Sequence, residues 1–367
     1  MNPALSGRLP DFPWDTIADA RARAAAHPEG LCDLSVGTPV DPVPELGVRA
    51  LADAASGWAG YPTVWGTPAL RAAIRSYLAT RWHSVALSDE NVLPVVGTKE
   101  LVAQLPLQLG LGPADLVVIP TTAYPTYEVG ARIAGARVHA TDDPAEAISL
   151  RPSLIWINSP ANPHGAIVAP EMLRAWVAAA REVGAVLASD ECYGEFAWEA
   201  EPVSILDPAV NAGSLAGLIA AFSLSKRSNI AGYRAGFLAG ATDLVTELLA
   251  VRKHSGLMLP GPVQAAMAVL LGDQDHVDRQ RERYLKRRGT LRPALEAAGF
   301  QIEHSEGSLY LWATRAEHCR NTIDYLAGLG ILVAPGDFYG SAGSRHVRIG
   351  LTASDERIEA AAARLAR

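Results

Sequence analysis

Between residues 92 and 240 the chain repeats one pattern, in which short apolar runs alternate with stretches whose apolar residues have helical spacing. The runs contain few polar residues, as expected for strands that are buried on both faces of a sheet. Strands and helices that alternate in this way predict a doubly wound α/β fold with a mostly parallel sheet. The predicted strands are Val92–Val96, Leu116–Pro120, Leu154–Ile157, Ala185–Ala188, Leu218–Phe222 and Ala235–Ala239.

A different pattern lies on either side of this region. A long charged helix, Asp275–Ala298, precedes three strand-like runs and a last helix, Asp355–Ala366. The N-terminal segment is rich in Pro and Gly and contains one short strand-like run, Leu31–Val36. We therefore expect a smaller α+β domain beside the large α/β domain. The expected divisions are 1–45 (N-terminal arm and part of the small domain), 46–262 (large domain) and 263–367 (C-terminal small domain).

Composition argues against several classes of protein. The 367 residues carry a net charge of -7, without long runs of one sign. Because nucleic-acid binding needs a concentrated basic patch, a nucleic-acid partner is not expected. The three cysteines are far apart, so neither a disulfide framework nor a structural zinc site is expected, and the nine histidines show no spacing typical of metal ligands.

The same sequence argues against export and membrane insertion. The N-terminus lacks the charged-then-apolar pattern of a signal peptide. The longest stretches without charge are interrupted by Gly, Ser, Asn or Pro, so no membrane span is expected. We expect a cytoplasmic protein.

Polar residues follow the predicted strands, where ligands bind in open α/β sheets. Gly97-Thr98-Lys99 comes after the first run and opens a helix, whose free N–H groups suit an anion such as phosphate. Taken singly, these residues could form turns, caps or packing contacts, but their order on successive strand ends favours a binding site. The other segments are Ala123-Tyr124-Pro125, NSPANPHG with Asn162, SDECY with Asp190 and Tyr193, and SLSK with Ser223, Ser225 and Lys226.

Four segments of the chain resemble the signatures of a known family. NSPANPHG, SDECY, SLSKRSNIAGYRAG and VRIGLTAS are similar to segments of class I/II aminotransferases, which are pyridoxal-phosphate enzymes of fold type I. More narrowly, PDFPWD, LSVGTPVDPVP, GYPTVWGTPALR and VVGTKELV resemble actinobacterial-type N-succinyldiaminopimelate aminotransferases. The likeness extends over essentially the whole chain. It implies a fold type I enzyme that binds pyridoxal 5′-phosphate and forms a homodimer with shared active sites.

The resemblance also implies roles for individual residues. Lys226 would bind the cofactor covalently, and Asp190 would pair with its ring nitrogen. Tyr193 and Asn162 would bind the ring's 3′ oxygen, and Tyr124 would stack on the ring. The phosphate would contact Gly97, Thr98, Ser223, Ser225 and Arg234, together with Tyr61 of the partner subunit.

For the substrate, the resemblance implies that Arg348 holds the α-carboxylate in a bidentate fork, close to Gly37 and Asn162. A succinylated substrate has further carboxylates, and Lys99 is the candidate for the distal one because a lysine is unfavourable at a helix N-terminus unless it has another role.

The implied reaction transfers an amino group from N-succinyl-LL-2,6-diaminopimelate to 2-oxoglutarate, a step of diaminopimelate and lysine biosynthesis. Two alternatives stay open, an aminotransferase for aspartate, alanine or aromatic donors and a pyridoxal-phosphate-dependent carbon–sulfur β-lyase. A non-enzymatic regulator built on the same fold would need an added DNA-binding domain. The chain has no room for one before residue 30.

Overall fold

The strands of the computed structural model form three sheets, of seven, four and two strands. The structure describes residues 5–367, so the first four residues of the expected arm lie outside it. In the largest sheet the order is β2-β8-β7-β6-β5-β3-β4, and among the described strands of this sheet only β8 is antiparallel to its neighbours. Their bounds are β2 Val92–Val95, β3 Leu116–Ile119, β4 Arg137–Ala140, β5 Leu154–Asn158, β6 Val186–Asp190, β7 Leu218–Ser223 and β8 Gly236–Gly240.

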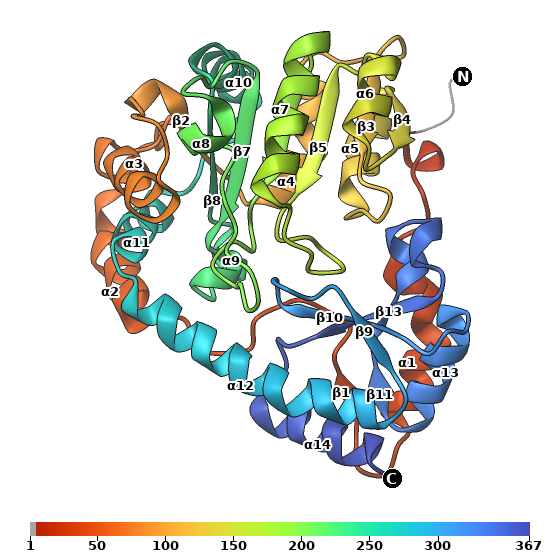
Figure 1. Ribbon diagram of the computed structural model, residues 1–367. Helices are drawn as coiled ribbons and strands as arrows, with labels where there is room; N and C mark the ends of the chain where they lie inside the picture. Colours follow the sequence, from red (N-terminus) through yellow and green to blue (C-terminus); the bar gives the residue numbers. More distant parts are fainter. Residues whose placement is uncertain (1–4) are drawn as a thin grey trace.

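Helices cover both faces of this sheet (Figure 1). Successive residues of a strand point to opposite faces, and both sets are buried, as Ile155 and Trp156 of β5 illustrate. The predicted doubly wound architecture is confirmed. One face packs against α3 (Pro68–Trp82), α7 (Pro170–Val183) and α11 (Gly261–Leu271), and the other against α4 (Thr98–Gln108), α5 (Thr126–Ala134) and α10 (Thr242–His254). The helices α2 (Glu45–Ala54), α6 (Pro144–Leu150) and α8 (Pro208–Asn211) pack beside α11 and α7.

The smaller part is built on the four-stranded antiparallel sheet, in the order β12-β13-β10-β9, and on the parallel pair β1-β11. The long helix α12 (Asp275–Ala297) runs from the large sheet's helices to this part (Figure 1). Ile17 and Ala24 of the N-terminal arm pack in the hydrophobic core of this smaller part. The other bounds are α1 Ala18–Ala25, β1 Cys32–Asp33, β9 Gln301–Glu303, β10 Tyr310–Thr314, α13 Cys319–Gly328, β11 Ile331–Leu332, β12 Ala334–Pro335, β13 His346–Gly350 and α14 Asp355–Leu365.

Four elements differ from the sequence prediction. The strands β4, β9 and β12 were not predicted, and one expected strand is shorter. In β4, Arg137 and Ala140 are exposed, Val138 and His139 are half-buried, and the four residues form no apolar run at this sheet edge. The expected strand Leu31–Val36 is limited to Cys32–Asp33, which pairs with β11. The division at residues 45 and 262 remains a proposal. Within residues 5–367 we find no helix that combines the length and the apolar character needed to cross a membrane.

Candidate active site

A cleft of about 1760 Å³ lies at the carboxyl ends of the parallel strands and is closed on its other side by residues of the N-terminal arm and of the four-stranded sheet. Most residues selected from the sequence line it. From the large part these are Thr98, Lys99, Tyr124, Asn162, Asp190, Tyr193, Ser223, Ser225, Lys226 and Arg234, and from the remainder of the chain Gly37 and Arg348.

Sheet topology explains this convergence. Asp190 is the last residue of β6 and Ser223 the last residue of β7. Lys226 follows within the short helix α9, Leu224–Arg227. Because β8 is antiparallel, it begins where its neighbours end, and Arg234 stands just before it. Residues far apart in the sequence therefore meet at one edge.

Asp190 is a buried carboxylate whose donors among the described residues belong to Tyr127 and Cys192. Its Oδ2 accepts a hydrogen bond from the Tyr127 hydroxyl at 2.8 Å, and its Oδ1 accepts one from the Cys192 backbone N–H at 3.2 Å. Burial raises the pKa of Asp190, and these hydrogen bonds oppose the rise. The sequence reasoning missed Tyr127, since nothing local shows that a residue of α5 reaches the end of β6.

Lys226 has an environment that favours its neutral form. Its Nζ donates a hydrogen bond to the backbone carbonyl of Gly37. Burial, together with the positive charges of Arg348 and Arg234, lowers the pKa of Lys226 to about 8. At pH 7 about a tenth of this amine is therefore uncharged, far more than for a lysine with an ordinary pKa of about 10.4, and this fraction can act as a nucleophile or base.

Arg348, on β13, is the buried cation of the cleft, with 4% of its surface exposed. Its Nη1 donates to Asn162 Oδ1 and its Nη2 to the Ser35 carbonyl, both at 2.8 Å. Its Cζ lies 4.0 Å from the centre of the Tyr310 ring. Among the described residues no carboxylate pairs with this guanidinium, and its buried Nε has no hydrogen-bond partner. The arrangement suits an incoming carboxylate.

Aromatic residues complete the centre of the cleft. The hydroxyls of Tyr193 and Tyr310 lie 2.9 Å apart, and burial raises the pKa of Tyr193. Tyr124 packs edge-on against Tyr127, with ring centres 5.7 Å apart and planes at 86°. Burial raises the pKa of Tyr124 to about 12. Both cleft tyrosines therefore stay protonated and can donate hydrogen bonds at neutral pH. Tyr310 was also missed in the sequence reasoning.

The start of α4 has the properties of a phosphate site. Gly97 precedes the helix with a φ of 79°, and the structure gives it no side-chain cap, which leaves first-turn N–H groups for an anion. A Cβ added at Gly97 would lie 2.2 Å from Arg234 Nη2, so only glycine allows this approach. The Ser223 and Ser225 side chains line the same part of the cleft.

Two selected residues occupy exposed positions. Lys99 lies on the exposed side of the first turn of α4, lines the cleft and has no ion-pair partner among the described residues. Tyr61 is 94% exposed and does not line the cleft of its own chain.

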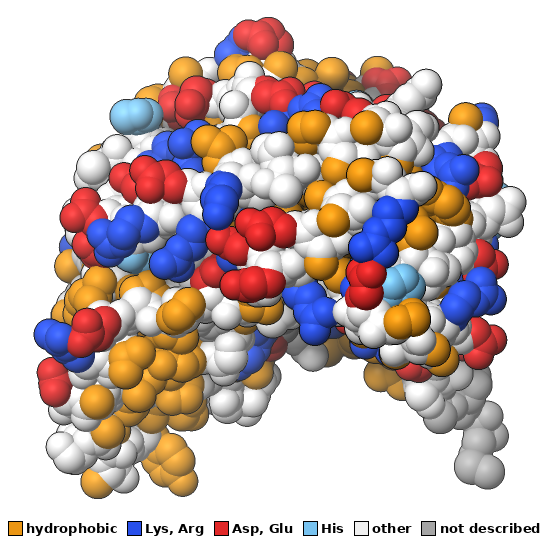
Figure 2. All heavy atoms as spheres, turned by 90° about the horizontal axis from the view of Figure 1, so that it is seen from below, with side chains coloured by type: hydrophobic (Ala, Val, Ile, Leu, Met, Phe, Trp, Pro, Cys, Tyr) orange, Lys and Arg blue, Asp and Glu red, His pale blue; other side chains and the backbone are white. Residues whose placement is uncertain are grey.

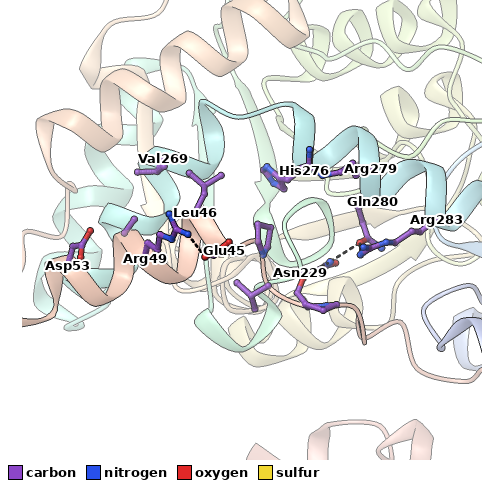
Figure 3. Close-up of a pocket in the computed structure, with 14 residues that line it drawn as sticks. Glu45, Leu46, Arg49, Asp53, Asn229, Val269, His276, Arg279, Gln280 and Arg283 are labelled. Atoms are coloured by element: carbon purple, nitrogen blue, oxygen red, sulfur yellow. Dashed lines mark hydrogen bonds and ion pairs between the residues drawn. The ribbon is translucent and has the colours of Figure 1, made fainter.

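A second pocket, of about 680 Å³, lies between α2 and α12 (Figure 3). Glu45 and Arg49 form an ion pair within α2 on one side, and Asn229 donates to Gln280 Oε1 at 2.9 Å on the other. None of the residues selected from the sequence lines this pocket. The candidate site is therefore the larger cleft.

The cleft fits pyridoxal phosphate. A lysine with a lowered pKa, a buried carboxylate, an aromatic ring and an anion site lie together on its walls. These are the groups that would bind the aldehyde, the ring nitrogen, the ring face and the phosphate.

Comparisons with known proteins agree with this geometry. Residues 29–365 match the family model for aminotransferase class I and II. The chain is 55% identical to a probable aminotransferase, Rv1178, of Mycobacterium tuberculosis, over 98% of this chain and 86% of that one. It is also 55% identical to the 4-dedimethylamino-4-oxo-anhydrotetracycline transaminase OxyQ of Streptomyces rimosus, over 97% and 99% of the two chains.

A solved structure described as a probable N-succinyldiaminopimelate aminotransferase from Thermus thermophilus superposes with a TM-score of 0.87 at 26% identity, covering 97% of this chain and 99% of that one. The match of the family model over most of the chain establishes the class, while the relatives differ in the substrates for which they are named. The chain belongs to the class I and II aminotransferases and is a pyridoxal-phosphate-dependent transaminase of fold type I.

Proposed function

We propose that this aminotransferase acts on N-succinyl-LL-2,6-diaminopimelate with 2-oxoglutarate as amino acceptor, and that it works as a homodimer. The observation that supports this substrate is that, besides Lys226 and Arg234, which we assign to the cofactor, the cleft wall carries two cations without acidic partners among residues 5–367, the buried Arg348 and the exposed Lys99. A substrate with carboxylates at both ends would contact both. Two similarities support a diaminopimelate-type substrate. One is to the Thermus thermophilus structure, and the other is the 30% identity to an LL-diaminopimelate aminotransferase of Dehalococcoides mccartyi.

In the proposed reaction Lys226 is the base. Pyridoxal phosphate, when bound, supplies an aldehyde that condenses with amines and a ring that accepts electrons from the substrate α-carbon. Because its pKa is lowered to about 8, Lys226 Nζ can take the proton from that carbon and return it to a neighbouring atom. Gly37, whose carbonyl accepts from Nζ, holds the amine on the side of the cleft where Arg348 lies.

The other residues orient the reactants. Asp190 would keep the ring nitrogen protonated, and Tyr193 and Asn162 would donate to the ring's 3′ oxygen. Arg348 would exchange its contacts to uncharged oxygens for the substrate carboxylate, which is a stronger, charge-assisted acceptor. The phosphate would be held by the α4 amides, Ser223, Ser225 and Arg234.

One observation favours a second candidate, a transaminase for a bulky polycyclic ketone. OxyQ is as similar to this chain as Rv1178 is. The cleft is also lined by Phe12, Trp14 and Phe338, and the Trp14 and Phe338 rings have centres 5.0 Å apart. Such aromatic rings would suit a large apolar substrate.

A substrate panel tests the proposal. With 2-oxoglutarate as acceptor, we expect N-succinyl-LL-2,6-diaminopimelate to give the highest kcat/KM among donors that include aspartate, alanine, kynurenine and aromatic amino acids. Glutamate formation measures each rate. Absence of activity with the succinylated donor would reject the proposed substrate. Formation of pyruvate and ammonia from cystathionine without any acceptor would indicate a β-lyase.

Replacing Lys99 tests the distal contact. We expect Lys99→Ala to lower kcat/KM for the succinylated donor about 5- to 150-fold, through KM, and to leave glutamate nearly unaffected. Lys253→Ala is the matched control, because Lys253 is exposed on α10 and does not line the cleft. Equal effects of Lys99→Ala on both substrates would remove Lys99 from the specificity site.

Subunit mixing tests the shared site. Tyr61 is exposed, as are the hydrophobic residues Val48 and Val269, and hydrophobic side chains gather at one corner of the face shown in Figure 2. We expect inactive Tyr61→Ala and Lys226→Ala subunits to recover part of the activity after mixing, because one hybrid site is intact. A fully active monomer in sedimentation would contradict the shared site.

The reactivity of Lys226 tests its lowered pKa. Because the neutral amine reacts, labelling of Lys226 in the cofactor-free protein by an acylating reagent should rise with pH and reach half of its maximum near pH 8. An ordinary lysine has a pKa of about 10.4. Mass spectrometry of the labelled peptides measures the rate, with exposed Lys286 as the internal control. A midpoint for Lys226 near that of a free amine would contradict the described environment.

A further inference from the structure

Tyr127, in the first turn of α5, is fully buried and does not line the cleft, yet its hydroxyl donates to Asp190 Oδ2 at 2.8 Å. We propose that Tyr127 is a positioning residue of the reaction, which keeps Asp190 a weak enough base to leave the proton on the cofactor's ring nitrogen. The proposal rests on the proposed function, specifically on the pairing of Asp190 with that nitrogen.

The hydrogen bonds of Asp190 show why the Tyr127 hydroxyl affects the proton affinity of this carboxylate. Among the described residues the donors to this carboxylate are the Tyr127 hydroxyl and the thiol and backbone N–H of Cys192, and no cation forms an ion pair with it. Burial raises the pKa of Asp190, and these donors counteract this effect by stabilising the charged form. Tyr127 therefore supplies the one hydrogen bond to Asp190, among the described residues, that comes from a side chain outside its own SDECY segment.

The position of the Tyr127 ring is fixed on two sides. The ring stacks on Trp156 with centres 4.9 Å apart and planes at 21°. Its other neighbour is Tyr124, the proposed stacking residue, which meets it edge-on at 5.7 Å. Tyr127 thus contacts Asp190 and Tyr124, two of the side chains that we expect to touch the cofactor ring. This rigidity fixes the direction from which the hydroxyl approaches Asp190.

The chemical consequence follows from proton affinity. If Asp190 lost the Tyr127 donor, its carboxylate would become more basic and would compete better for the proton that it shares with the ring nitrogen. A ring without that proton accepts electrons from the substrate α-carbon less well, so kcat should fall. Substrate binding through Arg348 would be unchanged, so KM should stay nearly constant.

A purely structural role for Tyr127 makes a different prediction. The molecule offers a comparison, because the buried Tyr77 also donates to a buried carboxylate, Glu195 Oε1, at 2.8 Å, at a site outside the cleft. Glu195 differs from Asp190 in forming ion pairs with Arg81 and Arg227 as well. If both hydroxyls only satisfy buried polar groups, Tyr127→Phe and Tyr77→Phe should lower the melting temperature similarly and have similar small effects on catalysis.

The experiment compares Tyr127→Phe, Tyr77→Phe and wild-type holoenzyme reconstituted with cofactor that carries ¹⁵N in the ring. We expect the ¹⁵N signal of Tyr127→Phe to move toward the unprotonated position, and kcat to fall about 10- to 100-fold, the range for one hydrogen bond to a charged group, with KM within about two-fold of wild type. Tyr77→Phe should retain the wild-type signal and kcat. A Tyr127→Phe enzyme with wild-type ¹⁵N signal and kcat would overturn the proposal.

Asp190→Asn separates this inference from the proposed function. If Asp190 holds the ring proton, Asp190→Asn shifts the ¹⁵N signal whatever Tyr127 does. A shift in Asp190→Asn without one in Tyr127→Phe rejects the role of Tyr127 alone. An unchanged signal in Asp190→Asn rejects the pairing of Asp190 with the ring, and with it the basis of the proposal. The infrared band of the Asp190 carboxyl in the cofactor-free variants gives an independent measure of its changed proton affinity.

Discussion

The site depends on Arg348, a buried positive charge that has no negative partner among residues 5–367. Taking a guanidinium out of water is expensive, and proteins normally repay this with a carboxylate nearby. Arg348 instead has uncharged oxygens of Asn162 and Ser35 and the faces of Tyr310 and Tyr339, at 4.0 and 5.2 Å. An incoming α-carboxylate would provide the missing charge, which suits the amino acid and 2-oxo acid substrates of aminotransferases. The same charge helps to lower the pKa of Lys226.

That guanidinium also connects the parts of the molecule. Arg348 belongs to β13 of the small sheet, while Asn162 follows β5 of the large sheet and Ser35 follows β1. The Arg348–Ser35 hydrogen bond joins residues 313 positions apart in the chain. The binding geometry for a carboxylate therefore exists only when both sheets and the N-terminal arm are folded together.

Much of the large sheet could be predicted from the sequence, because strands buried on both faces are continuous apolar runs. Asp190, Ser223 and Lys226 could be selected because they follow such runs at the carboxyl edge. The edge strand β4 could not be predicted, since its four residues are exposed at both ends and half-buried in the middle and form no apolar run. The family resemblance, rather than periodicity, supplied the individual roles.

Contacts between residues far apart in the sequence could not be predicted from it. Tyr127 stands in the same short segment as Tyr124, but only the packing of α5 against the sheet brings its hydroxyl to Asp190. Tyr310 could not be selected either, because in the sequence it is one more apolar residue of a predicted strand. Only the structure shows that its hydroxyl lies 2.9 Å from that of Tyr193.

The most direct test of the account is to locate the cofactor on the chain. Purified enzyme reduced with borohydride in the presence of pyridoxal phosphate, then digested and mapped by mass spectrometry, should carry the reduced cofactor on the peptide that contains Lys226. The chain has only three other lysines, Lys99, Lys253 and Lys286. Label on any of these in place of Lys226 would contradict the assignment of the cleft as the catalytic site.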